Sequence, residues 1–171
     1  ISRAIPVVSE ENTEPGGQTY WAVDPLDGTR EFIDQTGGFC VKIGLIHKSE
    51  PVAGVVFCPA QNVLYAALKD GPAVKITPDG VMKRITTRSV MESGTLKTLF
   101  NKKHGDPAEY RIRRAELAAQ GLRLSTRPLV RSGLPRNLRV AEGLADAHLG
   151  CGFGSGPAAG SGYVWDVAPD D

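Results

Sequence analysis

The sequence has no excess of charge of either sign. Twenty lysines and arginines stand against nineteen aspartates and glutamates, which leaves a formal net charge of +1 at pH 7. A protein that binds a nucleic acid polymer or an anionic membrane surface through electrostatics needs a broad charged face. The charge balance therefore argues against both kinds of partner.

Membrane-spanning and secretory signals are also missing. No apolar run approaches the roughly 20 residues that a helix needs to cross a bilayer. Residues 1–12, ISRAIPVVSEEN, lack the basic start and the apolar middle of a signal peptide. Neither a transmembrane segment nor a secretory leader is therefore predicted.

Cysteine is scarce. Cys40, Cys58 and Cys151 are odd in number, lie far apart and form no CxxC pair. This pattern argues against a disulfide framework and against a zinc cluster. We therefore expect a reducing, cytoplasmic location.

The chain begins at Ile1 without an initiator methionine and stops at Asp171, directly after an acidic segment. We expect both ends to be cut, so that residues 1–171 form one partial domain.

Short apolar runs separated by turn residues dominate the first half of the chain. Residues 5–8 and 20–23 predict two short strands, and acidic residues follow each of them. Three further runs predict an antiparallel meander, and a fourth predicts one more strand: 39–46, 51–57 and 63–68, then 74–76.

The second half of the chain adds helical patterns. Residues 106–120 start with Asp106 as a cap and Pro107 in the first turn, and they predict a helix. Residues 136–147 predict a second helical stretch, and the glycine-rich residues 150–162 predict a loop. Strands and helices mixed in this order indicate a layered α/β or α+β fold.

Acidic residues gather in three short segments near predicted strands: 9–11 (SEE), 24–29 (DPLDGT) and 165–168 (WDVA). Carboxylates that the fold groups together are hard oxygen ligands, and they suit Mg²⁺, which keeps positions open for water and phosphate. Each segment alone is typical of an ordinary surface turn. All three together predict a magnesium site.

The middle segment brings two acids to one place. Asp24 and Asp27 are three residues apart around a turn that Pro25 fixes, so both carboxylates can converge on one point. The same turn exposes the Leu26 carbonyl as a neutral ligand.

An anion site is predicted directly after these acids. Gly28 and Thr29 lead into the short helical segment TREFI, and their amides would point at an anion. A metal pair beside such a turn indicates phosphate ester hydrolysis, in which one ion activates water and both stabilise the developing charge.

Rival phosphate motifs do not match. Haloacid dehalogenase phosphatases use DxDGT, with two acids two residues apart, whereas Asp24 and Asp27 are three apart. The segment 150–162 contains no GxGxxG that follows a strand and opens a helix, and the chain has no P-loop.

The three motifs PVVSEE, WAVDPLDGTREFI and YVWDVA together resemble the inositol monophosphatase/fructose bisphosphatase superfamily. DPLDGTREFI, GVVFCPAQNVLYAA and AEGLAD are most similar to its CysQ-type 3′(2′),5′-bisphosphate nucleotidases. The resemblance implies an α-β-α-β-α sandwich and a lithium-sensitive phosphatase of sulfur metabolism. Such an enzyme removes the 3′-phosphate of adenosine 3′,5′-bisphosphate and gives AMP and phosphate.

The resemblance also implies which groups bind two Mg²⁺ ions. Glu10 would bind the first ion and help to activate the water, while Glu11 would stay outside the set of direct ligands. Asp24 would bridge both ions, and the Leu26 carbonyl would join the first. Asp27 and Asp166 would hold the second.

Substrate contacts are implied around the same motif. Thr29 would bind the attacking water, and the amides of Gly28 and Thr29 would hold the phosphate, with Arg30 beside them. His104 lies in the basic stretch 101–104, which could meet a second phosphate or a base. A solvated basic turn is the alternative for that stretch.

Two positions bear on the substrate. Ala159 stands where inositol-specific members carry an acid, which disfavours inositol phosphate. The residues before Asn137 read SGLPR, where nucleotidases often have GSSLK, so part of the base pocket is open to question.

The superfamily begins with helices that carry an acid partner for the active-site threonine, and it continues beyond WDxA. Without these parts, we expect the isolated chain to be aggregation-prone or homo-oligomeric and at most weakly active. The alternatives are a phosphatase for inositol or histidinol phosphate, or a catalytically dead remnant that binds metal or nucleotide.

Overall fold

The computed structural model describes residues 5–9, 17–88, 95–100, 111–112, 115–116, 118–119, 123–128 and 134–149. These residues fall into two compact units. The first contains the described residues up to Ile85 together with 134–135, and the second contains the others. Within the described ranges, no helix is long and apolar enough to span a membrane.

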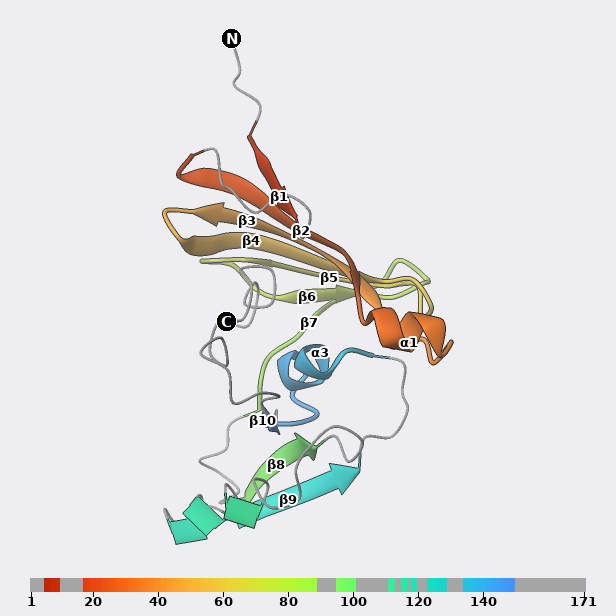
Figure 1. Ribbon diagram of the computed structural model, residues 1–171, viewed down its shortest axis with the longest axis vertical. Coiled ribbons are helices and arrows are strands. Elements are labelled where there is room, and N and C mark those ends of the chain that lie inside the picture. The colour runs from red at the N-terminus through yellow and green to blue at the C-terminus, as the bar shows by residue number, and fades with distance from the viewer. Residues whose placement is uncertain are drawn as a thin grey trace. The chain divides into compact units, whose positions relative to one another are not determined.

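The first unit is built on a seven-stranded sheet whose strands follow each other in sequence order (Figure 1). Its strands are β1 (Val7–Ser9), β2 (Thr19–Asp27), β3 (Cys40–His47), β4 (Glu50–Cys58), β5 (Val63–Leu68), β6 (Val74–Ile76) and β7 (Met82–Arg84). Strand β1 is parallel to β2, and every later pair is antiparallel. The predicted meander is confirmed, whereas the short strand β7 was not predicted.

The sheet has one well-buried face. Residues paired across neighbouring strands point to the same side. Several such pairs consist of two buried residues each, among them Val8 with Ala22, Tyr20 with Ile46, and Val56 with Tyr65. In β3 the buried positions are Cys40, Lys42, Gly44 and Ile46, and the apolar Ile43 between them is exposed. A charged lysine therefore lies on the buried face.

Helix α1 (Thr29–Ile33) begins directly after β2, as the TREFI segment predicted. Gly28 connects the two elements in the left-handed region, with φ of 85°. A Cβ atom at this position would lie 2.9 Å from the carbonyl oxygen of Gly38 and 3.2 Å from the Cα atom of Phe39. Both the backbone angle and the close approach therefore require glycine here.

The second unit contains a parallel sheet in the order β10-β8-β9, formed by β8 (Thr95–Phe100), β9 (Arg123–Pro128) and β10 (Ala147–Leu149). These strands were not predicted. Parallel neighbours need a crossover connection, and helical residues stand between the strands in the chain. They are residues 111–112, 115–116 and 118–119, within the predicted helix 106–120, and α3 (Arg136–Ala141).

The predicted helical stretch 136–147 is wrong in its second half. Helix α3 ends at Ala141, Gly143 follows with φ of 69°, and Ala147 already belongs to β10. A residue in the left-handed region terminates a helix, and glycine adopts it at little cost. The predicted loop 150–162 lies outside the described residues.

Asp146 anchors the start of β10 to β8. Its side chain is 0% exposed and accepts two hydrogen bonds from Arg88, from Nε at 3.0 Å and from Nη2 at 2.8 Å. The same carboxylate accepts the backbone N–H of Lys97 at 2.6 Å. The hydrogen bonds of the Arg88 guanidinium, together with the Lys97 N–H, hold the pKa of Asp146 below its ordinary value.

The lowered pKa gives a prediction for acid stability. The contribution of the Asp146 carboxylate is complete above pH 3.8, its ordinary pKa, and is lost as the pH falls through that value toward the lower pKa of the folded state. Asp146→Asn should therefore lower the melting temperature at neutral pH and make it fall less steeply on acidification. Circular dichroism melts between neutral pH and pH 3 measure both effects, with the exposed Asp70→Asn as control. Equal acid sensitivity in wild type and Asp146→Asn would contradict the assignment.

Gly28 can be tested against a matched glycine. Gly80 also has a positive φ, of 77°, but nothing lies within 4 Å of its Cβ position. Gly80→Ala should cost about 1 kcal/mol of unfolding free energy from the left-handed backbone alone. Gly28→Ala should cost more, because its methyl group also meets the backbone at 38–39. Urea unfolding measures the difference, and equal costs would show that the close approach is unimportant.

Candidate functional site

The two acids of the DPLD segment lie within a strand, at a bulge. Asp24 pairs with Lys42 and Asp27 pairs with Cys40, so three steps along β2 match two steps along β3. The sequence predicted a turn after a short strand, and that prediction is wrong, because β2 continues to Asp27. Pro25 has no N–H to donate to the ladder, which favours an irregularity at this point.

The extra residue decides which way the acids point. Side chains alternate along a regular strand, so residues three apart face opposite sides of the sheet. The bulge resets this alternation and puts Asp27 on the face that carries Asp24 and Lys42. The carboxylates therefore share one side of the sheet, through a bulge and not through the predicted turn.

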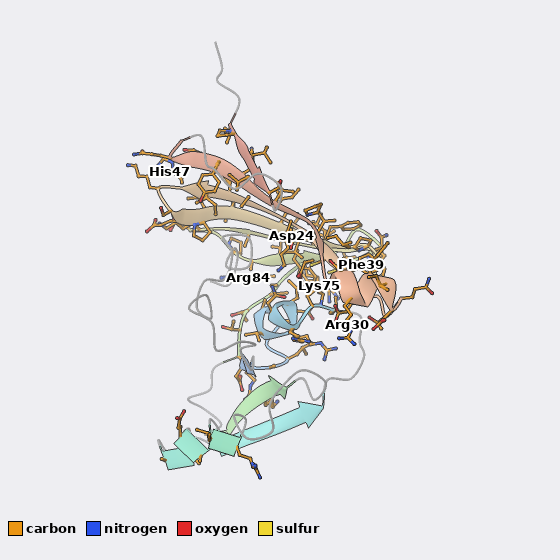
Figure 2. The ribbon with its side chains drawn as sticks, in the orientation of Figure 1. Asp24, Arg30, Phe39, His47, Lys75 and Arg84 are labelled. Atoms are coloured by element: carbon orange, nitrogen blue, oxygen red, sulfur yellow. The ribbon has the colours of Figure 1, made fainter. Side chains whose placement is uncertain are left out.

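Asp24 is 3% exposed and lies on the buried face of the sheet. Its Oδ1 accepts the backbone N–H of Leu26 at 3.0 Å, which holds the carboxylate over the bulge. Figure 2 shows Asp24 on the sheet toward the end that carries α1, with His47 at the opposite end. The site is therefore built from β2, β3 and the start of α1.

Asp27 is in contact with a thiol and an ammonium group. Its Oδ2 lies 3.2 Å from Nζ of Lys42 and accepts a hydrogen bond from Sγ of Cys40 at 3.5 Å. Lys42 is 8% exposed and Cys40 is fully buried, whereas one third of the Asp27 side chain is exposed. The carboxylate thus lies at the border between the buried face and solvent.

The charge states of these groups follow from their surroundings. Burial acts to lower the pKa of Lys42, but the attraction of Asp27 and its hydrogen bond outweigh burial, so the pKa is raised and the amine stays charged. Burial raises the pKa of the Cys40 thiol well above its usual range, and the negative charge of Asp27 raises it further. Cys40 is therefore a neutral thiol.

The predicted substrate-binding residues follow the bulge. The hydroxyl of Thr29 donates to the carbonyl oxygen of Leu26 at 3.4 Å. The N-terminus of α1 has no side-chain cap, since Gly28 occupies the cap position. Arg30, labelled on α1 in Figure 2, is exposed and forms an ion pair with Asp34 at 3.6 Å.

The structure brings together only part of the predicted ligand set. Asp24, Leu26 and Asp27 lie within one bulge, whereas Glu10, Asp166 and His104 lie outside the described residues. No group of three or more histidine, cysteine, aspartate or glutamate side chains is close enough to hold a metal ion in the described part of the chain.

Sequence reasoning missed Lys42 and the thiol beside it. A signal was present, because Cys40 and Lys42 alternate with the apolar residues of the 39–46 run. Antiparallel pairing of that run with the strand before Asp24 could have placed the lysine opposite the acids. The alternating apolar residues Val41, Ile43 and Leu45 instead indicated that the opposite face of the strand is the buried one.

Known proteins resemble the chain over most of its length. The model of the inositol monophosphatase family matches residues 3–170. The 3′(2′),5′-bisphosphate nucleotidase CysQ of Escherichia coli K12 is 48% identical over 90 residues, which cover 49% of this chain and 35% of that protein. The CysQ of Aggregatibacter actinomycetemcomitans is 32% identical over 159 residues, which cover 88% of this chain and 56% of that protein.

A solved structure agrees with the sequence relatives. The crystal structure of CysQ from Bacteroides thetaiotaomicron, a bacterial member of the inositol monophosphatase family, superposes with a TM-score of 0.61 at 27% identity. The match covers 84% of this chain and 58% of that one, so the chain spans little more than half of the solved relative. The fold predicted from the resemblance is confirmed for the part that the chain contains. Sequence and structure together show that this chain belongs to the inositol monophosphatase family.

Proposed function

We propose that the chain carries the central part of a divalent-metal-dependent phosphomonoesterase that converts adenosine 3′,5′-bisphosphate into AMP and phosphate. The observation that carries the proposal is the bulge, which gathers two carboxylates of the family motif on one face of the sheet. The CysQ relatives support the choice of a nucleoside bisphosphate as substrate.

The donor set fits a hard cation. Asp24 and Asp27 offer carboxylate oxygens, and the Leu26 carbonyl is a neutral oxygen within the same bulge. The nearby Cys40 stays protonated, so no soft thiolate is present at this point. Oxygen donors of this type prefer Mg²⁺ to softer metals.

The metal site that we propose has ligands from three parts of the chain. Asp24, Asp27 and the Leu26 carbonyl would be joined by Glu10 and Asp166 from the other two acidic motifs. When bound, divalent ions supply water activation and charge stabilisation for hydrolysis of a phosphate ester. The residues of the chain supply position, because the bulge orients the carboxylates before any substrate arrives.

Phosphate binding would use the residues after the bulge. Gly28 and Thr29 would hold the transferred phosphate through their amides, and no capping side chain competes at this N-terminus. The Thr29 hydroxyl, which now donates to Leu26, would turn to the attacking water. Arg30 is exposed and could exchange Asp34 for a substrate phosphate. His104 would contact the second phosphate or the base.

A substrate panel tests the proposal. We expect released phosphate from adenosine 3′,5′-bisphosphate at millimolar Mg²⁺, and much less from inositol monophosphate or histidinol phosphate. Chelation should abolish the release, because the carboxylates alone cannot activate water, and lithium should inhibit it. Activity that survives exhaustive chelation would contradict the metal site. Preference for inositol monophosphate would overturn the substrate.

Individual acids give a second test. Asp24→Asn should abolish activity, because one carboxylate is proposed to serve both ions, while the exposed Asp34→Asn should retain it. Glu10→Gln should reduce activity far more than Glu11→Gln. Phosphate release measured for all four variants decides the assignment, with circular dichroism as the check on folding. If Glu11→Gln were the more damaging, the wrong glutamate would have been assigned to the metal.

A further inference from the structure

Lys42 is the one buried cation in the described part of the chain, and the proposed function gives it no role. Its neighbours on the same face of β3 are uncharged: Cys40, Gly44 and Ile46. Its cross-strand partners are Asp24 on β2 and Val56 on β4. A buried ammonium is costly unless it is paired, so this lysine depends on the carboxylates beside it.

The pairing uses the atoms that a metal ion would need. Nζ of Lys42 lies 3.2 Å from Oδ2 of Asp27, and the charge of Asp24 also acts on the ammonium. A divalent ion bound through Asp27 would meet a positive charge already in place. Like charges within a few ångströms in a partly buried site repel strongly. The ammonium and the ion therefore compete for the same carboxylate.

We propose that Lys42 is a resident counter-cation of the Asp24–Asp27 pair, which holds the two carboxylates together without metal and weakens divalent ion binding at Asp27. This inference rests on the proposed function, since it takes these carboxylates as metal ligands. It adds that the ion position at Asp27 has a lower affinity for divalent ions than its oxygen donors alone would give it. A metal ion can then bind at Asp27 only if the Lys42 ammonium is displaced.

Manganese titration measures the effect without any turnover. Lys42→Gln keeps a hydrogen-bond donor beside Asp27 but removes the charge, so it should bind Mn²⁺ roughly tenfold more tightly at the weaker position. Lys42→Arg keeps the charge and should bind like wild type. Lys75→Gln is the matched control. The cross-strand row that begins with Lys42 and Val56 continues through Tyr65 to Lys75, and the Lys75 ammonium lies over the ring of Tyr65. Isothermal titration calorimetry gives the affinities and the number of ions.

A measurement on the wild-type chain keeps the test independent of how the variants fold. The Nζ resonance of Lys42, followed by ¹⁵N NMR, should move on addition of Mg²⁺, while that of Lys75 should not. An unchanged Lys42 resonance at saturating Mg²⁺ would overturn the inference.

The outcomes separate the inference from the proposed function. If wild type and Lys42→Gln bind Mn²⁺ with equal affinity, the inference fails and the metal site stands. If neither binds Mn²⁺ at all, the proposed function fails and the inference fails with it. Tighter binding in Lys75→Gln as well would show a general charge effect and would also overturn the role of Lys42.

Discussion

The candidate site depends on one extra residue in β2. Between Asp24 and Asp27 the strand gains a position relative to β3, and the proline in this stretch cannot take part in the ladder. Without the bulge, strand alternation would place the two carboxylates on opposite faces. With it, both acids face Lys42, and the chain leaves the strand at Gly28 to enter α1. The shared face of these two carboxylates and the position of the proposed phosphate-binding turn thus follow from one backbone irregularity.

Charge on a buried face needs compensation, and the site shows how the sheet provides it. Asp24 and Lys42 are the buried charged residues of the seven-stranded sheet, and they are directly opposite each other on β2 and β3. Neighbouring positions of this face hold an apolar cluster of Val8, Tyr20, Ala22 and Ile46. An ammonium flanked by two carboxylates can stay in such surroundings, because each group satisfies another. The core and the candidate site are therefore parts of one face.

The second unit shows the same principle in a purely structural role. The Asp146 carboxylate accepts hydrogen bonds from Arg88 and from the Lys97 amide, so it joins the start of β10 to β8, which is far away in sequence. All of its partners are donors, and nothing on the described residues suggests a ligand there. In the DPLD bulge, by contrast, Asp27 is partly exposed and lies beside an uncapped helix N-terminus. The partial exposure of Asp27 and the missing side-chain cap at the N-terminus of α1 distinguish the candidate site from the structural carboxylate Asp146.

Alternation, turn residues and motif spacing are local patterns, and they were enough to predict the meander from β3 to β5, the short helix after Gly28 and the family. The sequence also identified Asp24 and Asp27 as a pair. The folded chain was needed to show that a bulge, not a turn, aligns them, since the register of β2 against β3 depends on pairing between separate segments. The same pairing brought Lys42 to Asp27. The parallel sheet β10-β8-β9 was likewise beyond local patterns, because its strands are joined only by long connections.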